Sequence, residues 1–267
     1  MASRSIDFNL EGKVALVTGA ARGLGRLFSL VLADAGADLV CADINGEALV
    51  ETGEAVEMGG RRCLTVLTDV SSPEDVRRLI EETVKEFGHI DVAVNNAGII
   101  TKPYRFHELP RTDWDRLIAI DLTGVFLCMQ EELRVMVAQK TGNIINVASV
   151  AGIRGVAPEL LPRANYVAAK HAVVGLTKQA ALEYAADNIR VNAIAPGWIS
   201  GTDIGSARTE GKADLDEALK KRRSEFIPLK RTGTPEELKG LLLYLASDAS
   251  TYVTGQVIAI DGGITAR

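Results

Sequence analysis

The first hundred residues alternate between short apolar runs and segments of helical composition. The apolar runs have strand length and cover 13–18, 38–43, 62–68 and 91–94. The helical segments cover 27–35, 47–58 and 73–87, and a glycine follows each of them. A repeated strand–helix order folds as a parallel sheet, because each crossover helix packs back onto the sheet. We therefore expect an α/β fold with helices on both faces of the sheet.

The rest of the chain continues this order. We predict a long helix over 112–137, a strand over 142–148, a helix over 164–186 and a strand over 189–195. A helix over 234–247 and a strand over 256–260 complete the pattern. The intervening segment 198–228 is irregular and rich in charge, and we expect it to form a lid over a substrate site. Because the sequence contains no repeat, low-complexity segment or linker, we expect one domain over 1–267.

Composition narrows the possible partners. The net charge of −5 gives no electrostatic reason to bind nucleic acid or an acidic membrane surface. Cys41, Cys63 and Cys128 lie in apolar stretches without metal-ligand spacing, as expected of free thiols in a reducing compartment. The first ten residues lack the apolar stretch of a signal peptide, and no apolar run of about 18 residues could span a membrane. We expect a cytoplasmic protein with a small-molecule substrate and no metal.

A glycine-rich turn follows the first strand. Gly19, Gly23 and Gly25 stand in a Gly-x3-Gly-x-Gly spacing, between a strand and a helix. This context lets the backbone approach a pyrophosphate at the start of a helix. The alternative is an ordinary strand–helix turn with no ligand, which the glycines by themselves do not exclude.

Asp43 ends the second strand, where a carboxylate can accept hydrogen bonds from both hydroxyls of an adenosine ribose. The same charge would repel the 2′-phosphate of NADP, by roughly 4 kcal/mol for unit charges about 4 Å apart at an effective dielectric of 20. Arg22 is a signal in the other direction, because it could reach a phosphate. We expect the effect of Asp43 to be the larger one, so NAD is favoured and NADP is less favoured.

Tyr166 and Lys170 stand four residues apart in a helical segment, which puts them on one face of the helix. An ammonium near a phenol stabilises the phenolate, so the pair can transfer a proton to or from an alcohol or a carbonyl. The alternative is a packed tyrosine beside an exposed lysine. The motifs elsewhere in the chain favour the proton-transfer pair over this alternative.

Taken together, these motifs resemble the short-chain dehydrogenase/reductase family, in its compact form of about 250 residues. The resemblance runs from Leu10 to Gly263. It rests on the glycine turn, on Tyr-x3-Lys at 166–170, and on Ser149 at a strand end. It rests also on Asn-Asn-Ala-Gly at 95–98, on Pro-Gly at 196–197 and on the closing segment 247–263. Each motif falls at a predicted strand end or helix, in the order found in the family.

This resemblance implies a single Rossmann-like doubly wound parallel sheet of about seven strands, with a nicotinamide cofactor and hydride transfer at a carbinol carbon. Tyr166 would be the general acid–base, Lys170 would hold the nicotinamide ribose, and Ser149 would hydrogen-bond the substrate oxygen. The cofactor-binding residues would be Gly19, Arg22, Gly23, Leu24, Gly25, Asp43, Asp69, Val70, Asn95, Ala97, Gly98, Tyr166, Lys170, Pro196, Gly197 and Ile199. The family commonly forms dimers and tetramers through its two long helices, so we expect a homo-oligomer.

Three departures from the family pattern stand out. Asp121 occupies the place of the family's fourth catalytic residue, an asparagine, and adds a negative charge beside Lys170. We still expect Asp121 to act in catalysis. The segment between Ser149 and Tyr166 is longer than usual, and its extra part near 158–163 would border the substrate entrance. Thr202 sits one place later than the family's threonine, which puts its cofactor contact in doubt.

The sequence constrains the substrate only broadly. Arg154, Arg163 and Arg208 could meet an anionic group such as a sugar acid, although solvated surface charges are the more ordinary interpretation. Because NAD favours oxidation in cells, we expect a dehydrogenase of a sugar, sugar acid, polyol or secondary alcohol. A 3-oxoacyl-thioester reductase would use the same motifs, but such biosynthetic reductases usually take NADP. A nucleotide-sensing protein that does not turn over is the alternative from a different class.

Overall fold

The computed structural model describes residues 8–157, 160, 163–201 and 213–266. A seven-stranded parallel sheet runs through them in the order β3-β2-β1-β4-β5-β6-β7. The strands are β1 Val14–Thr18, β2 Asp38–Asp43, β3 Cys63–Leu67, β4 Val92–Asn95, β5 Gly142–Val147, β6 Ile189–Pro196 and β7 Val257–Ile260. The strand order reverses between β1 and β4, the point at which open sheets of this kind bind ligands. The prediction of a Rossmann-like doubly wound sheet is confirmed.

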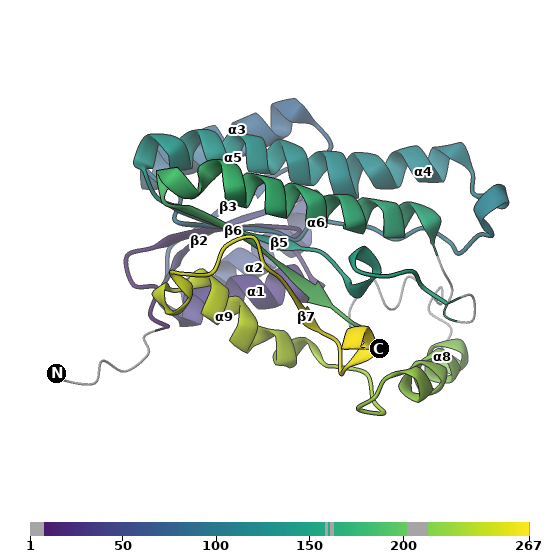
Figure 1. Ribbon diagram of the computed structural model, residues 1–267. Coiled ribbons are helices and arrows are strands. Elements are labelled where there is room, and N and C mark those ends of the chain that lie inside the picture. The colour runs from purple at the N-terminus through teal and green to yellow at the C-terminus, as the bar shows by residue number, and fades with distance from the viewer. Residues whose placement is uncertain (1–7, 158–159, 161–162, 202–212, 267) are drawn as a thin grey trace.

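Helices cover both faces of the sheet (Figure 1). On one face lie α1 Gly23–Asp34, α2 Gly46–Met58 and α9 Lys239–Ala246. On the other lie α3 Pro73–Phe87, α4 Arg111–Ile118, α5 Val125–Gln139 and α6 Ala164–Tyr184. In β1, Ala15 and Val17 pack toward the first layer, while Val14 and Leu16 pack toward the second. Burial of both faces explains why the strands are continuous apolar runs rather than alternating ones.

Local signals set the helix ends. Ser72 caps α3 by accepting a hydrogen bond from the Asp75 amide at 3.2 Å, and Pro73 begins the helix. Gly88 ends it with φ 83°, a conformation that glycine adopts without strain. These positions match the predicted helix over 73–87.

Two predicted elements differ from the structure. The long helix expected over 112–137 is α4 and α5 joined by a π-helical turn, Ala119–Gly124. A π turn fits an additional residue into a helix and is frequent at functional sites. The segment 198–228, expected to be irregular, contains helix α8, Ala213–Phe226. Residues 202–212 of the predicted lid, which include Thr202 and Arg208, lie outside the described residues. So do 158–159 and 161–162 of the segment expected to border the substrate entrance.

Candidate active site

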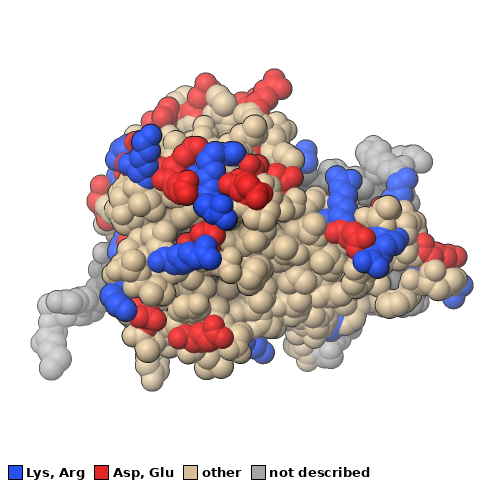
Figure 2. All heavy atoms as spheres, turned by 90° about the horizontal axis from the view of Figure 1, so that it is seen from above, with Lys and Arg blue, Asp and Glu red and all other residues tan. Residues whose placement is uncertain are grey.

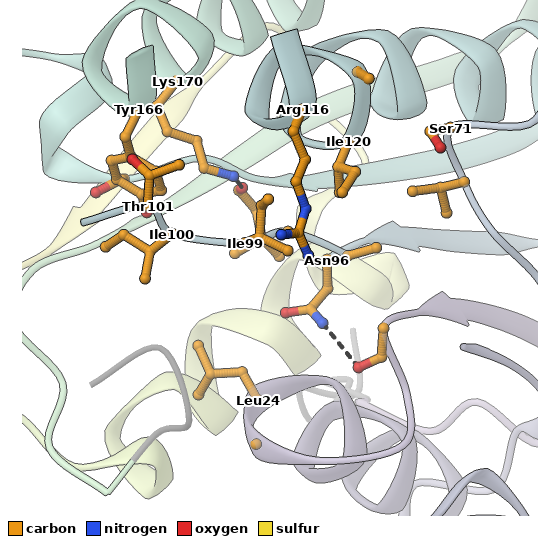
Figure 3. A pocket seen from close by; sticks show the side chains of 18 of the residues that line it. Leu24, Ser71, Asn96, Ile99, Ile100, Thr101, Arg116, Ile120, Tyr166 and Lys170 are labelled. Carbon is orange, nitrogen blue, oxygen red and sulfur yellow. Dashed lines mark hydrogen bonds between the residues drawn. The ribbon is translucent and has the colours of Figure 1, made fainter. Parts of the chain in front are cut away.

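A cavity of about 880 Å³ lies at the carboxyl ends of the strands. Residues that end or follow five strands line it, namely Gly19 after β1, Asp43 in β2, Asn96 after β4, Ala148 after β5 and Gly197 after β6. Carboxyl ends of parallel strands meet at one edge of a sheet, so residues far apart in sequence share one wall. Figure 3 shows this cavity with Ser71 toward one end and Tyr166 toward the other.

The glycine turn forms part of the cavity wall. Gly19 has φ +68°, and a Cβ there would lie 2.9 Å from the Ala97 Cα. Helix α1 begins at Gly23, and its first turn carries no side-chain oxygen that could cap its amides. Arg22 occupies the N-cap, and a guanidinium only donates hydrogen bonds. Gly23 and Leu24 line the cavity, and no side chain of this first turn caps its amides, so the turn fits the phosphates of a dinucleotide.

Gly25 has a different role from the one expected. It does not line the cavity. A Cβ at Gly25 would lie 1.9 Å from the Gly19 carbonyl oxygen and 2.6 Å from the Asn96 Nδ2. The residue is therefore needed for close packing of α1 beneath the turn, which supports the cavity indirectly.

Asp43 is fixed at the carboxyl end of β2. Its Oδ2 accepts a hydrogen bond from the Ala21 amide at 3.0 Å, and its Oδ1 accepts one from the Asn45 amide at 2.9 Å. The carboxylate lines the cavity with free lone pairs, which two ribose hydroxyls could occupy. Asp69 and Val70 line the same end. This end of the cavity has the polar and apolar groups that an adenosine requires.

Ser149, Tyr166 and Lys170 lie together on the cavity wall. Tyr166 and Lys170 project from the same face of α6, and the Lys170 Nζ is 5.5 Å from the centre of the Tyr166 ring. Lys170 also donates a hydrogen bond to the Val147 carbonyl at 3.1 Å. Ser149 accepts a hydrogen bond from the Ala151 amide at 3.1 Å, which leaves its hydroxyl proton available to a ligand. The arrangement can exchange a proton with a ligand oxygen and stabilise charge on it.

Asp121 lies behind this wall rather than on it. It is fully buried in the π-helical turn and is not among the residues that line the cavity. Its Oδ1 accepts a hydrogen bond from the Ile99 amide at 2.8 Å, and its Oδ2 is 3.3 Å from the Lys170 Nζ. A Cβ at Gly98 would lie 2.9 Å from that Oδ2, so Gly98 makes room for the carboxylate. Asp121 thus contacts the lysine and not the ligand space.

The charges of this buried pair depend on each other. Burial raises the pKa of Asp121 above its ordinary value, and the nearby Lys170 charge partly offsets that rise. Burial is the largest single influence on the pKa of Lys170 and would lower it, but the charges of Asp121 and Tyr166 and the hydrogen bond to Asp121 together raise that pKa above its ordinary value. Lys170 therefore stays protonated at neutral pH, with Asp121 as its counterion.

Asn95, expected to line the nucleotide, faces away from the cavity. Its Nδ2 donates to the Glu132 Oε2 and to the Asn146 Oδ1, each at 3.1 Å. Asn146 in turn donates to the Thr177 hydroxyl at 2.9 Å. Successive strand residues point to opposite faces of a sheet, and the side chain at the end of β4 is directed into the α5–α6 layer. Asn95 therefore joins β4, β5, α5 and α6 beneath the site.

Most of the other predicted cofactor residues line the cavity: Gly19, Arg22, Gly23, Leu24, Asp43, Asp69, Val70, Ala97, Gly98, Tyr166, Lys170, Pro196, Gly197 and Ile199. Sequence reasoning missed Asn96, Thr101 and Arg116, which line it as well. Asn96 donates from Nδ2 to the carbonyl oxygens of Thr18 and Gly19, at 3.0 and 3.2 Å. The paired asparagines at 95–96 were a visible signal, but only the structure shows which one faces the ligand space.

Arg163 is not a solvated surface charge. Its side chain is buried, and its Nε donates to the Thr101 carbonyl oxygen. Arg154 donates from Nη1 to the Ile264 carbonyl at 2.7 Å. Arg163 thus anchors the backbone at Thr101, which lines the cavity, and Arg154 anchors the backbone near the C-terminus. These contacts do not support the suggestion that the two arginines bind an anionic substrate.

Comparisons with known proteins agree with this geometry. The family model described as enoyl-(acyl carrier protein) reductase matches residues 19–265. The 3-oxoacyl-[acyl-carrier-protein] reductase FabG of Thermotoga maritima is 41% identical over 255 residues, which cover 96% of this chain and 98% of that protein. The 2-dehydro-3-deoxy-D-gluconate 5-dehydrogenase of Escherichia coli is 40% identical over 261 residues, covering 97% and 98%.

Solved structures extend the likeness to three dimensions. The crystal structure of NAD+-bound xylitol dehydrogenase has a TM-score of 0.89 at 33% identity, covering 95% of this chain and 99% of that one. Levodione reductase has a TM-score of 0.91 at 35% identity, covering 97% and 99%. The motifs, the cavity and these relatives lead to one conclusion: the chain is an oxidoreductase of the short-chain dehydrogenase/reductase family, whose members bind nicotinamide cofactors.

Proposed function

We propose that this protein is an NAD-dependent dehydrogenase that oxidises a secondary alcohol, with a sugar, sugar acid or polyol as substrate. The observation that carries the proposal is the convergence of Ser149, Tyr166 and Lys170 on a cavity that also contains the glycine turn and Asp43. One site thus combines a proton-transfer pair with groups suited to a dinucleotide.

The residues divide the chemistry among them. A bound NAD supplies the acceptor for the hydride that leaves the carbinol carbon. The Tyr166 oxygen takes the hydroxyl proton as the carbonyl forms, and the Ser149 hydroxyl donates a hydrogen bond to the same substrate oxygen. The Lys170 ammonium projects from the same face of α6 as Tyr166 and would hold the ribose next to the nicotinamide. In the reverse direction the same groups return a proton to the carbonyl oxygen.

Asp43 supports NAD over NADP. Its anchored carboxylate suits ribose hydroxyls and would repel a 2′-phosphate. Arg22 lines the same cavity and would favour a phosphate, so the two residues have opposite effects on cofactor preference.

We predict that Asp43→Ala lowers the ratio of kcat/KM for NAD to kcat/KM for NADP by tenfold or more, about 1.4 kcal/mol. Asp34→Ala, which removes a carboxylate at the far end of α1, is the matched control. An unchanged ratio in Asp43→Ala would contradict the assignment.

The substrate class rests on the relatives together with Asp43. The Escherichia coli relative is named as a sugar-acid dehydrogenase, and the xylitol dehydrogenase structure is titled as NAD+-bound. The Thermotoga maritima relative instead supports a second candidate, a 3-oxoacyl-thioester reductase. The two candidates differ in cofactor and in substrate size, so direct assay separates them.

The decisive assay follows cofactor reduction by absorbance. NAD and NADP are tested in parallel with aldoses, sugar acids, polyols, secondary alcohols and 3-hydroxyacyl thioesters, and Tyr166→Phe is the control. Turnover of one carbohydrate class with NAD, lost in Tyr166→Phe, is the expected result. Preference for a thioester with NADP would favour the second candidate. Cofactor binding without turnover of any substrate would favour a nucleotide-sensing protein.

We further propose that the protein is a single-domain homo-oligomer of the cytoplasm. Figure 2 looks onto the helices that lie above the sheet in Figure 1, and it shows a broad uncharged area between charged clusters. Phe126 of α5 and Leu182 of α6 are 45% and 80% exposed, which favours burial against a second copy.

Free thiols at Cys41, Cys63 and Cys128 suit a reducing compartment. Within the described residues, no helix combines the length and the apolar character needed to cross a bilayer. A monomer in light scattering at micromolar concentration would overturn the oligomer.

A further inference from the structure

An arginine faces the cavity from the side opposite the glycine turn. Arg116 lies in the second turn of α4 and lines the cavity, with its side chain exposed to solvent. Figure 3 shows the side chain extending from α4 toward Asn96, between Ile99 and Ile120. Its guanidinium therefore lies in the cavity and not on the outer surface of the helix.

The charge of Arg116 is not neutralised on its own helix. Arg111, one turn earlier, is paired with Asp115 at 2.7 Å. Asp113 lies three residues before Arg116 but forms no ion pair with it among the described residues; its carboxylate instead raises the pKa of Tyr104. Ile120 occupies the following turn. Over the part of the chain that the structure describes, the Arg116 guanidinium makes no hydrogen bond or ion pair. A cation aimed into a ligand cavity without a partner has its five donors available to an anion.

The position of Arg116 along the cavity indicates which anionic group of a ligand it could bind. Asn96 is fixed to the glycine turn through its hydrogen bonds to Thr18 and Gly19. Arg116 therefore lies across from the turn at which α1 begins, with Ser71 to one side and Tyr166 to the other in Figure 3. A dinucleotide with its adenosine near Asp43 and Ser71 and its nicotinamide near Tyr166 has its diphosphate between them. The acids that line the cavity at the adenosine end, Asp43 and Asp69, make that end unfavourable for an anion.

We propose that Arg116 binds the diphosphate of the cofactor from the α4 side, so that the two phosphates are held between this guanidinium and the amides of the glycine turn. The inference rests on the proposed NAD-dependent function. The amides at the start of α1 supply partial positive charge and Arg22 supplies one full charge from the glycine turn, while Arg116 adds a second full charge from α4, with a fork of donors that matches phosphate oxygens. Ile99 and Ile120 flank the arginine stem and leave its charged end in the cavity.

Isothermal titration with NAD, ADP and adenosine tests the inference without requiring turnover. Arg116→Gln should raise the Kd for NAD and for ADP about tenfold, the usual scale for one charge-assisted hydrogen bond, and leave the Kd for adenosine unchanged. The Kd values of Arg116→Lys for NAD and ADP should lie between those of the wild type and Arg116→Gln, because lysine keeps the charge but lacks the forked donors of a guanidinium. Arg105→Gln is the matched control, since Arg105 is exposed nearby and does not line the cavity. The Kd for NAD should also rise more steeply with salt in the wild type than in Arg116→Gln.

Each other outcome overturns a specific step. If the wild type binds NAD and Arg116→Gln binds it equally well, the arginine is a solvated surface charge. An equal loss of affinity for adenosine would put the contact on the nucleoside and not on the diphosphate. A comparable loss in Arg105→Gln would show a general charge effect. Failure of the wild type to bind either NAD or ADP would overturn the proposed function, and this inference with it.

Discussion

Asp121 and Glu132 are two fully buried carboxylates on the same side of the sheet, yet their surroundings differ. Asp121 has the Lys170 ammonium at 3.3 Å and the Ile99 amide at 2.8 Å. Glu132, in α5, accepts one hydrogen bond from the Asn95 amide, and its Oε1 has no partner within the described residues. The first carboxylate has a cation to balance it and the second does not.

This difference decides which carboxylate is charged. Desolvation disfavours an ionised carboxylate, and an adjacent cation is the main compensation. For Glu132, burial outweighs the hydrogen bond from Asn95 and raises the pKa from 4.5 to about 7. Burial raises the pKa of Asp121 as well, but the Lys170 charge and the hydrogen bonds from Ile99 and Lys170 act against that rise. At equal burial, the neighbouring cation therefore distinguishes a counterion of the active site from a titrating group in the core.

The largest expected effect comes from removing the cation. Lys170→Met leaves Asp121 buried without its partner, which should lower the free energy of unfolding by about 3–5 kcal/mol at pH 8. Adding Asp121→Asn to that variant should recover part of the loss, because the amide oxygen can still accept from Ile99 without a charge. Urea denaturation of the wild type, both single variants and the double variant measures the coupling. Strictly additive changes would show that the two side chains do not interact.

Glu132→Gln should have the next largest effect, and in the opposite direction. Below pH 4.5 the carboxyl is protonated in both states; between about 4.5 and 7 the unfolded chain loses its proton while the folded chain keeps it. The wild type should therefore lose up to about 3 kcal/mol of stability across that range, whereas the variant should not. The new amide can also donate to the Asn95 Oδ1, which lacks a partner among the described residues.

Denaturation at pH 4.5 and at pH 8 checks this expectation. Glu54→Gln, an exposed position on α2, serves as the control and should follow the wild type at both values. If Glu132→Gln and the wild type lose stability in parallel between the two pH values, Glu132 does not titrate in this range.

The smallest of the three effects concerns catalysis. Asp121→Asn removes the charge that helps to raise the pKa of Lys170, whereas the burial that lowers this pKa is unchanged. The ammonium should then lose its proton at lower pH, and the alkaline limb of the pH–rate profile for alcohol oxidation should move to lower pH. Asp115→Asn makes the same charge change on the exposed side of α4 and should leave the profile in place. Superimposable profiles for Asp121→Asn and the wild type would mean that Asp121 does not affect the protonation of Lys170.

The sequence by itself determined the features that depend on neighbours in the chain. Strands came from apolar runs, helix ends from Ser72 and from the glycines, and the Tyr166–Lys170 face from helical periodicity. Asp43 and the glycine turn were predictable for the same reason, since both follow directly from where a strand ends. Such signals operate over one helical turn or one strand, a range within which side-chain positions follow from backbone geometry.

Only the tertiary structure decided the rest. In the sequence, the family resemblance singles out Asp121, but no local signal indicates that Glu132 is buried without a cation beside it. The π-helical turn directs Asp121 to Lys170 on α6, and the end of β4 directs Asn95 to Glu132 and Asn96 to the cavity. Arg116, likewise, extends toward Asn96 only because the fold places α4 beside the cavity. The charge, burial and ligand contacts of these side chains depend on which helix or strand packs against them, and those neighbours are distant in the sequence.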